Sequence, residues 1–162
     1  MNTLFTVGHS TRKRSELVAL LKHFGVDLLF DIRSIPYSGY NPQFNREEME
    51  KEMPRTGIAY EHIAALGGKR PSQEVIAAAK SCSERSHGFA GYMETEEFKR
   101  GLDYVLMRVD EGRTVALMCA ESDPAHCHRF HVADAVQGRG YGVQHIVKPD
   151  DLRDHPATLF TY

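Results

Sequence analysis

Two stretches of sequence decide the fold: Asp27-Leu-Leu-Phe-Asp-Ile-Arg33 and Thr114-Val-Ala-Leu-Met-Cys119. Each has a continuous apolar centre of strand length, and such a run is typical of a parallel strand covered on both faces. Each also ends in polar or reactive residues, which are Asp31 and Arg33 in the first stretch and Cys119 in the second. We therefore expect a parallel sheet with chemistry at the carboxyl ends of its strands.

Strands and helices are predicted to alternate around these two stretches. Further strands are expected at residues 4–7, 58–63 and 143–147, and the Pro- and Gly-containing segment 34–44 is expected to be a shaped loop. Helices are indicated by apolar side chains at i, i+3, i+4 and i+7 and by capping residues. They are expected from Leu17 to Gly25, Asn45 to Met53, Ser72 to Ala79, Thr95 to Gly112 and Asp123 to Gly138.

Four of these helix starts are predicted from local capping residues, of which Ser72 and Thr95 are single N-cap residues. Asn45 followed by Glu48 resembles a capping box. Asp123 followed by Pro124 is typical of an N-cap and a first helical residue. The alternation of strands and helices favours a single three-layer α/β domain over residues 1–162, in which a mainly parallel sheet has helices on both faces.

Length and charge limit the possible classes of protein. A chain of 162 residues fits one domain with a core of its own. The net charge of −2 gives no general attraction to nucleic acid or to an anionic membrane. The N-terminus has no basic leader followed by a long apolar run, and the three cysteines are an odd number. We expect a cytoplasmic protein with reduced thiols and without a membrane span.

Polar residues follow three of the predicted strands. His9 and Ser10 follow the first strand, Asp31 and Arg33 end the second, and Cys119-Ala-Glu121 ends the strand of residues 114–119. Ligands of open α/β sheets bind beyond the carboxyl ends of the strands, so we expect these side chains to lie near one another. Ordinary loop residues, and a purely structural Asp31–Arg33 pair, are the alternatives.

The segment from Cys119 to Arg129 supports three hypotheses. A helix N-terminus with Arg129 favours a bound phosphate or carboxylate. Cys119, His126, Cys127 and His128 together could bind a transition metal such as zinc or iron. The third hypothesis makes Cys119 a nucleophile, because a strand that ends in Cys and leads to an Arg on a helix resembles rhodanese sulfurtransferases and cysteine phosphatases.

Several segments together resemble an uncharacterised, mostly bacterial family, the domain of unknown function 488. The resemblance extends over nearly the whole chain, and it implies an α/β fold without an assigned activity. It also singles out Tyr37, Asn41, Gln43 and the strand Tyr60-Glu-His62 as site residues. The motifs that carry it are Thr6-Val-Gly-His-Ser10, Asp31-Ile-Arg-Ser-Ile-Pro36, Asn41-Pro-Gln-Phe44, Ala65-Leu-Gly-Gly68, Phe89-Ala-Gly-Tyr92 and Cys119-Ala-Glu…Pro124…His126-Cys-His-Arg129.

Other residues of these motifs suit ligand binding. Gly67 and Gly68 would allow the backbone to approach a ligand closely, although a simple loop turn is an equal alternative. Tyr37 and Tyr92 could stack on a nucleobase or could be ordinary half-buried aromatics. Imidazole ordinarily titrates near neutral pH, so His9 and His128 are candidates for acid–base roles.

The working hypothesis is an enzyme, with a hydrolase among the possibilities, that acts on a small phosphorylated or nucleotide-like ligand or on a nucleic-acid end. Arg33 and Arg129 would hold the anion. Ser10, Tyr37, Asn41, Gln43, Gly67, Gly68 and Tyr92 would complete the ligand site, and Asp31, Glu121, His128, His9 and Cys119 would carry the chemistry. The alternatives are a thiol enzyme that uses Cys119, a protein that binds metal through His126 and Cys127, and a non-catalytic sensor of an anionic metabolite.

Overall fold

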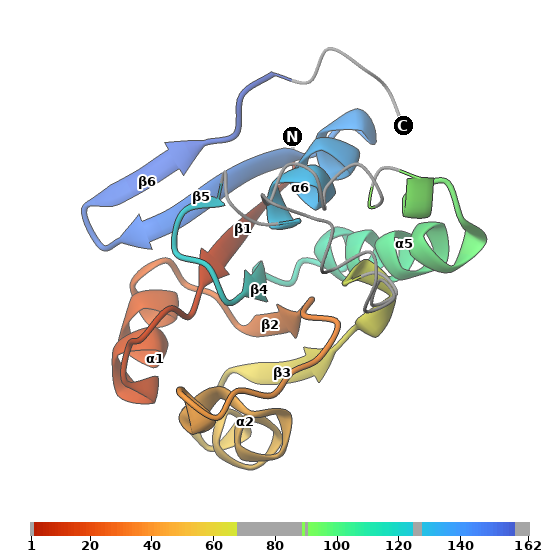
Figure 1. Cartoon of the computed structure of the whole chain (residues 1–162). Coiled ribbons are helices and arrows are strands. Elements are labelled where there is room, and N and C mark those ends of the chain that lie inside the picture. Colours follow the sequence, from red (N-terminus) through yellow and green to blue (C-terminus); the bar gives the residue numbers. More distant parts are fainter. Residues whose placement is uncertain (1, 68–88, 90, 125–127, 158–162) are drawn as a thin grey trace.

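The computed structural model describes residues 2–67, 89, 91–124 and 128–157, and these form one six-stranded α/β sheet (Figure 1). The strand order is β3-β2-β4-β1-β5-β6, in which β6 is antiparallel to β5 and the other neighbours are parallel. The predicted mainly parallel sheet is confirmed. The strands are β1 (Thr3–Gly8), β2 (Leu28–Asp31), β3 (Ala59–His62), β4 (Val115–Cys119), β5 (Gly142–Lys148) and β6 (Asp151–Asp154).

Helices cover both faces of the sheet, as the continuous apolar runs of β2 and β4 predict (Figure 1). Leu29 of β2 and Met118 of β4 pack with α1 (Arg14–His23) and α2 (Arg46–Glu52) on one face. Phe30 of β2 and Leu117 of β4 pack with α5 (Glu96–Asp110) and α6 (Arg129–Gly138) on the other. Successive strand residues point to opposite faces, so each strand contributes to both cores. Three short 3₁₀ turns lie in the first half of the chain: η1 (Pro42–Phe44), η2 (Pro54–Thr56) and η3 (Ala64–Leu66).

Two helix boundaries confirm the capping analysis. Thr95 Oγ1 accepts a hydrogen bond from Phe98 N at 3.3 Å, so Thr95 caps α5 as predicted. Gly25 has a φ of 74°, a left-handed conformation that ends α1 at low cost because glycine has no Cβ.

Two expectations are wrong, and one strand was not predicted. α6 begins at Arg129 and not at Asp123–Pro124, because His128 occupies the N-cap position and its ring bonds across to the end of β2. Asn45 precedes α2, but its side chain makes no cap and accepts from Ser38 N at 2.7 Å, which ties down the loop. β6 was not predicted, because its charged, exposed sequence lacks apolar alternation and pairs only as an edge strand.

The helix predicted from Ser72 to Ala79 lies outside the described residues. Within the described part of the chain, no helix is long and apolar enough to cross a membrane.

Candidate functional site

An open pocket of about 390 Å³ lies over the carboxyl ends of β1, β2 and β4. β1 and β4 are neighbours, yet β1 leads into α1 on one face of the sheet and β4 leads toward α6 on the other. The pocket therefore occupies a topological switch point, the usual ligand position in open α/β sheets. Its lining residues are His9, Arg33, Ser34, Ile35, Tyr37, Ser38, Asn41, Cys119, Ala120 and His128.

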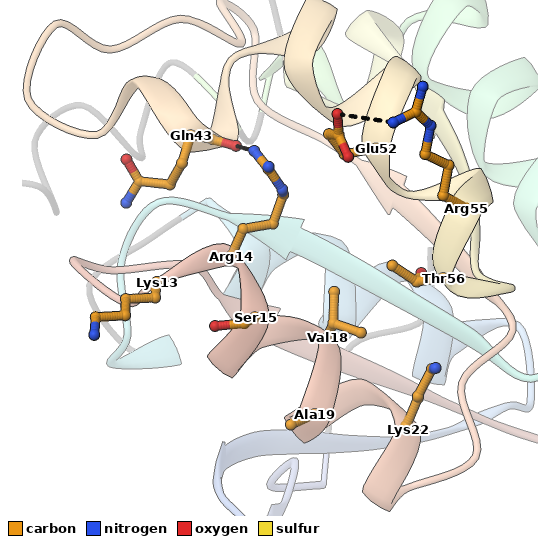
Figure 2. Close-up of a pocket in the computed structure, with 10 residues that line it drawn as sticks. All are labelled: Lys13, Arg14, Ser15, Val18, Ala19, Lys22, Gln43, Glu52, Arg55 and Thr56. Carbon is orange, nitrogen blue, oxygen red and sulfur yellow. Dashed lines mark hydrogen bonds and ion pairs between the residues drawn. The ribbon is translucent and has the colours of Figure 1, made fainter.

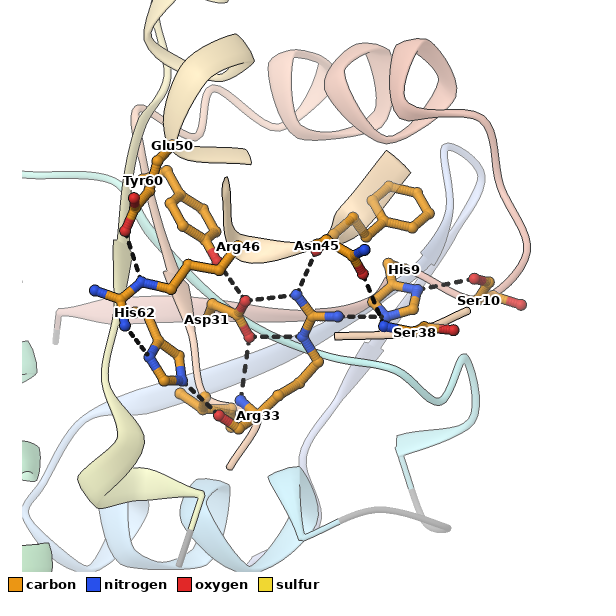
Figure 3. A network of polar contacts seen from close by, with 12 residues as sticks. His9, Ser10, Asp31, Arg33, Ser38, Asn45, Arg46, Glu50, Tyr60 and His62 are labelled. Atoms are coloured by element: carbon orange, nitrogen blue, oxygen red, sulfur yellow. Dashed lines mark hydrogen bonds and ion pairs between the residues drawn. The ribbon is translucent and has the colours of Figure 1, made fainter. Parts of the chain in front are cut away.

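A buried ion pair between Asp31 and Arg33 supports one wall of the pocket (Figure 3). Asp31 Oδ1 accepts from Arg33 Nε at 2.9 Å, and Oδ2 accepts from Nη2 at 2.7 Å. Arg33 N and the Tyr60 hydroxyl also donate to this carboxylate, at 3.1 and 2.5 Å. Asp31 is fully buried, and these four donors satisfy its two oxygens. The carboxylate thus fixes the plane of the guanidinium.

The charges of this pair shift the titration of their neighbours. Burial opposes the charge of Arg33, but hydrogen bonding and the negative charge of Asp31 outweigh it, so the pKa of Arg33 is raised. Burial, together with the same carboxylate, raises the pKa of Tyr60 well above its usual range. Tyr60 consequently stays protonated and donates its O–H to Asp31.

Arg33 keeps one N–H group available on the pocket side. Its Nη2 also donates to Phe44 O at 2.5 Å, and its Nη1 lies 3.3 Å from His9 Nε2. A guanidinium carries five N–H groups, and the contacts with Asp31, Phe44 and His9 use all but one of them, which lies on Nη1. Arg33 lines the pocket, so this N–H is one of the donors that a ligand there could use.

His9 is held in one tautomer. Its Nδ1–H donates to Ser10 O at 2.8 Å, so Nε2 carries the lone pair that accepts from Arg33. The ring stacks on Phe44 with centroids 4.5 Å apart. Ser10 has a φ of 52°, an uncommon conformation for a residue with a side chain, and it marks the sharp turn after β1.

Two further histidines hold the end of β2. His128 Nε2 donates to Ile32 O at 2.9 Å, and His62 Nε2 donates to Arg33 O at 2.6 Å. Gly67 approaches the same segment so closely that a Cβ would lie 2.4 Å from Ser34 N. Gly67 therefore approaches the backbone of the segment after β2 and not a ligand. A glycine is necessary here because a larger side chain would clash with that backbone.

The end of β4 forms the opposite wall. The carbonyls of Cys119 and Ala120 accept from the amides of His9 and Ser10, each at 2.9 Å. The Cys119 side chain is only 1% exposed, and its Sγ donates to the Glu121 carbonyl at 3.7 Å. The thiol is thus covered by its surroundings and bonded to the main chain of its own loop.

Arg129 lies behind the pocket and not in it. The side chain is fully buried, and its Nη2 donates to Ser122 O at 3.2 Å. Within the described residues its Nε and Nη1 have no hydrogen-bond partner. Of the two arginines expected to hold an anion, only Arg33 lines the pocket.

Comparison with protein families identifies the chain. The domain of unknown function DUF488 matches residues 13–136 of the 162. The protein belongs to the DUF488 family. The matched region contains Arg33, Cys119 and His128, whereas His9 and Ser10 precede it. No curated protein matches the chain, and no solved structure matches it either.

The pocket of this DUF488 protein brings together many of the predicted residues: His9, Arg33, Tyr37, Asn41, Cys119 and His128. Others lie elsewhere. Glu121 is exposed and does not line the pocket, and Gln43 turns away to donate to Arg12 O at 2.8 Å. Tyr92 packs against Phe89 and Phe98. Asp31, Ser10 and Gly67 support the walls from behind. Gly68, His126 and Cys127 lie outside the described residues.

Sequence analysis missed four lining residues and one supporting residue of the DUF488 pocket. Ser34, Ile35, Ser38 and Ala120 line it, and Phe44 supports both His9 and Arg33. Sequence position could have indicated some of them, because Ser34 follows Arg33, Ala120 follows Cys119, and Phe44 ends the Asn41–Phe44 motif. Among the described residues, no group of three His, Cys, Asp or Glu side chains could hold a metal ion.

Proposed function

We propose that this DUF488 protein is an enzyme that acts on a small phosphorylated or nucleotide-like ligand in the pocket at the strand ends. The observation that carries the proposal is the buried Arg33 guanidinium, which is locked by Asp31 and retains an N–H on the pocket side. A guanidinium in a fixed orientation suits the oxygens of phosphate and carboxylate groups. No carboxylate is among the lining residues that the structure describes, so none of these opposes an anion.

The rest of the lining also suits a phosphorylated ligand with a ring. The Ser34 and Ser38 hydroxyls and the Asn41 amide provide neutral hydrogen-bonding groups. Tyr37 is 70% exposed and Tyr40 is 98% exposed, although large aromatic side chains are usually covered. Exposed aromatic rings on a loop beside a pocket are suitable platforms for stacking on a nucleobase.

We assign proton transfer to His128 and positioning to Asp31. His128 lines the pocket, and an imidazole side chain can serve as a general acid or base. Asp31 is fully buried and already accepts four hydrogen bonds, which makes it a support for Arg33. Cys119 donates to a carbonyl from an almost fully buried position, so the contacts favour a packing role over a nucleophilic one.

The decisive variant is Arg33→Gln. We expect calorimetry to show that the wild-type protein binds at least one member of a panel of mononucleotides and sugar phosphates. Arg33→Gln should weaken that binding about 10- to 100-fold, because a charge-assisted hydrogen bond is lost. Arg153→Gln is the matched control, because Arg153 forms a similar bidentate pair with Asp151 on β6. Asp31→Asn/Arg33→Gln replaces the single variant if loss of the buried partner unfolds the chain.

Turnover of the bound ligand is then followed by phosphorus NMR and mass spectrometry, with His128→Gln as the second variant. Loss of turnover with retained binding would support the assignment of His128. Binding without turnover of any ligand would instead favour the non-catalytic sensor. Equal binding by the wild-type and Arg33 variants, or no binding of any panel member, would refute the proposed ligand class.

A further inference from the structure

A second hollow, a groove of about 730 Å³, lies between α1 and the η2 turn (Figure 2). Val18 and Ala19 of α1 contribute apolar surface, and Glu52 is the one carboxylate among the described residues that line it. The basic residues that line it are Lys13, Arg14, Lys22 and Arg55, and we call this hollow the basic groove. This local excess of positive charge contrasts with the net charge of −2 for the whole chain.

The positive charges of the basic groove are only weakly paired. Arg55 lies 3.7 Å from Glu52, and its side chain is 68% exposed. Arg14 lies 3.9 Å from Glu48 at the surface. Exposed ion pairs of such length contribute little, so a ligand can replace them at small cost. In the described part of the chain, Lys13 and Lys22 form no ion pair at all.

The spacing of these charges fits an extended anion. Lys13 and Lys22 stand at the two ends of α1, nine residues apart, which corresponds to about 14 Å along a helix axis. Arg55 belongs to the η2 turn, on the other side of the hollow from α1, and its guanidinium lies beside Glu52 (Figure 2). A single phosphate cannot contact both ends of such a groove, whereas a chain of several phosphates can.

The η1 turn connects the basic groove with the strand-end pocket: Gln43 of the turn lines the groove, and Asn41, just before the turn, lines the pocket. Arg14, on the groove side, donates from Nη1 to Gln43 O at 3.2 Å. Arg33, on the pocket side, donates from Nη2 to the next carbonyl, that of Phe44. Two adjacent peptide groups thus connect the arginines of the two hollows. A polymer with its end in the pocket needs to pass only this turn to reach the groove.

We propose that the basic groove binds the phosphodiester backbone of a single-stranded nucleic acid whose terminal nucleotide enters the strand-end pocket. The inference rests on the proposed function and narrows its substrate class from a free nucleotide to a strand end. An acidic peptide would also complement the basic residues. Tyr37 and Tyr40 decide between the two, because these exposed rings on the same 34–44 segment can stack on bases.

The test measures fluorescence anisotropy of internally labelled, 5′-phosphorylated dT and rU decamers over a range of salt concentrations. The groove variant is Lys13→Gln/Lys22→Gln/Arg55→Gln. The control variant, Lys51→Gln/Arg100→Gln/Lys148→Gln, removes the same charge from exposed positions outside both hollows. We expect the groove variant to bind a decamer at least about tenfold more weakly than the control variant. Its slope of log affinity against log salt should be smaller by about 2, as for three lost phosphate contacts.

Equal decamer affinity in the groove and control variants would overturn the inference, as would failure of the wild-type protein to bind either decamer. Binding of a glutamate decamer with no binding of the oligonucleotides would overturn it in favour of an acidic peptide.

Mononucleotide binding by wild type and Arg33→Gln, measured in parallel, reports on the pocket. If the mononucleotide binds but the groove substitutions leave decamer affinity unchanged, the groove inference falls and the proposed function stands. In a further outcome, the groove substitutions weaken decamer binding, but Arg33→Gln changes neither mononucleotide nor decamer binding. The groove is then confirmed as a nucleic-acid site, and the proposed function falls.

Discussion

Acidification is expected to destabilise the region where β1, β5 and α6 meet, because a buried histidine there must remain neutral. His145 Nδ1 lies 2.5 Å from Thr6 Oγ1, and its Nε2 lies 2.8 Å from His155 Nδ1. His155 Nε2 in turn lies 2.7 Å from Asp134 Oδ1. Two neutral rings satisfy this chain in one direction: the Thr6 hydroxyl donates to His145, His145 donates to His155, and His155 donates to the carboxylate.

The pKa of His145 gives the size and sign of the effect. Burial, followed by the charges of His155, Arg129 and Arg153, lowers this pKa from 6.5 to about 3. Above 6.5 the ring is neutral in both the folded and the unfolded state, so it adds no pH dependence. As the pH falls from 6.5 toward 3, the unfolded state binds a proton that the folded state rejects, and the free energy of unfolding decreases. At about pH 5 the loss amounts to roughly 2 kcal/mol.

Urea unfolding between about pH 8 and pH 5 measures this loss in wild type and in His145→Gln. The glutamine amide can accept from Thr6 and donate to His155, but it does not titrate. We expect the wild-type protein to lose about 2 kcal/mol more than the variant over this interval, because all other titrating groups are common to both. His23→Gln, on the exposed end of α1, should keep the wild-type pH dependence. If the free energy of unfolding falls by the same amount with pH in wild type and in His145→Gln, the neutral, buried state of His145 is refuted.

Two further substitutions test the walls of the strand-end pocket. Gly8→Ala should lower the free energy of unfolding by about 1–3 kcal/mol in urea titrations, because the new Cβ would lie 1.7 Å from the Glu121 carbonyl oxygen and the chain must shift. Unchanged stability would mean that residues 119–122 move freely. Tyr60→Phe should cost about 1–2 kcal/mol, because the buried Asp31 carboxylate loses one of its donors, whereas Tyr104→Phe, at a part-buried contact with Glu61, should cost less. A larger loss of unfolding free energy in Tyr104→Phe than in Tyr60→Phe would contradict the importance of the Tyr60 donor for the buried Asp31 carboxylate.

Local sequence was enough to predict most of the sheet and its helices. The apolar runs of β2 and β4 are long enough and continuous enough to require cover on both faces, and the structure has helices on both. Because parallel strands end at one edge of a sheet, their polar termini were also expected to meet, and His9, Arg33 and Cys119 do line one pocket. The pairing of Asp31 with Arg33 followed from the alternation of side chains along a strand.

Capping patterns failed wherever a tertiary partner competed for the same side chain. The carboxamide of Asn45 satisfies Ser38 N in the loop and not the first turn of α2. His128 reaches across the sheet end to Ile32 O, and α6 begins at the next residue, beyond the expected Asp123–Pro124 start. These contacts join residues far apart in the chain, so no local pattern contains them.

The sequence by itself thus determined an α/β sheet with reactive residues at its strand ends, because periodicity and strand direction are local properties of the chain. Only the tertiary structure decided which of those residues line the pocket. It placed the Arg33 guanidinium at a pocket wall and buried Arg129 behind the pocket, although both arginines looked alike in sequence. It also gathered Lys13, Lys22 and Arg55 into one groove. Burial and the assembly of distant charges depend on how helices pack against the sheet, and that packing is a property of the whole chain.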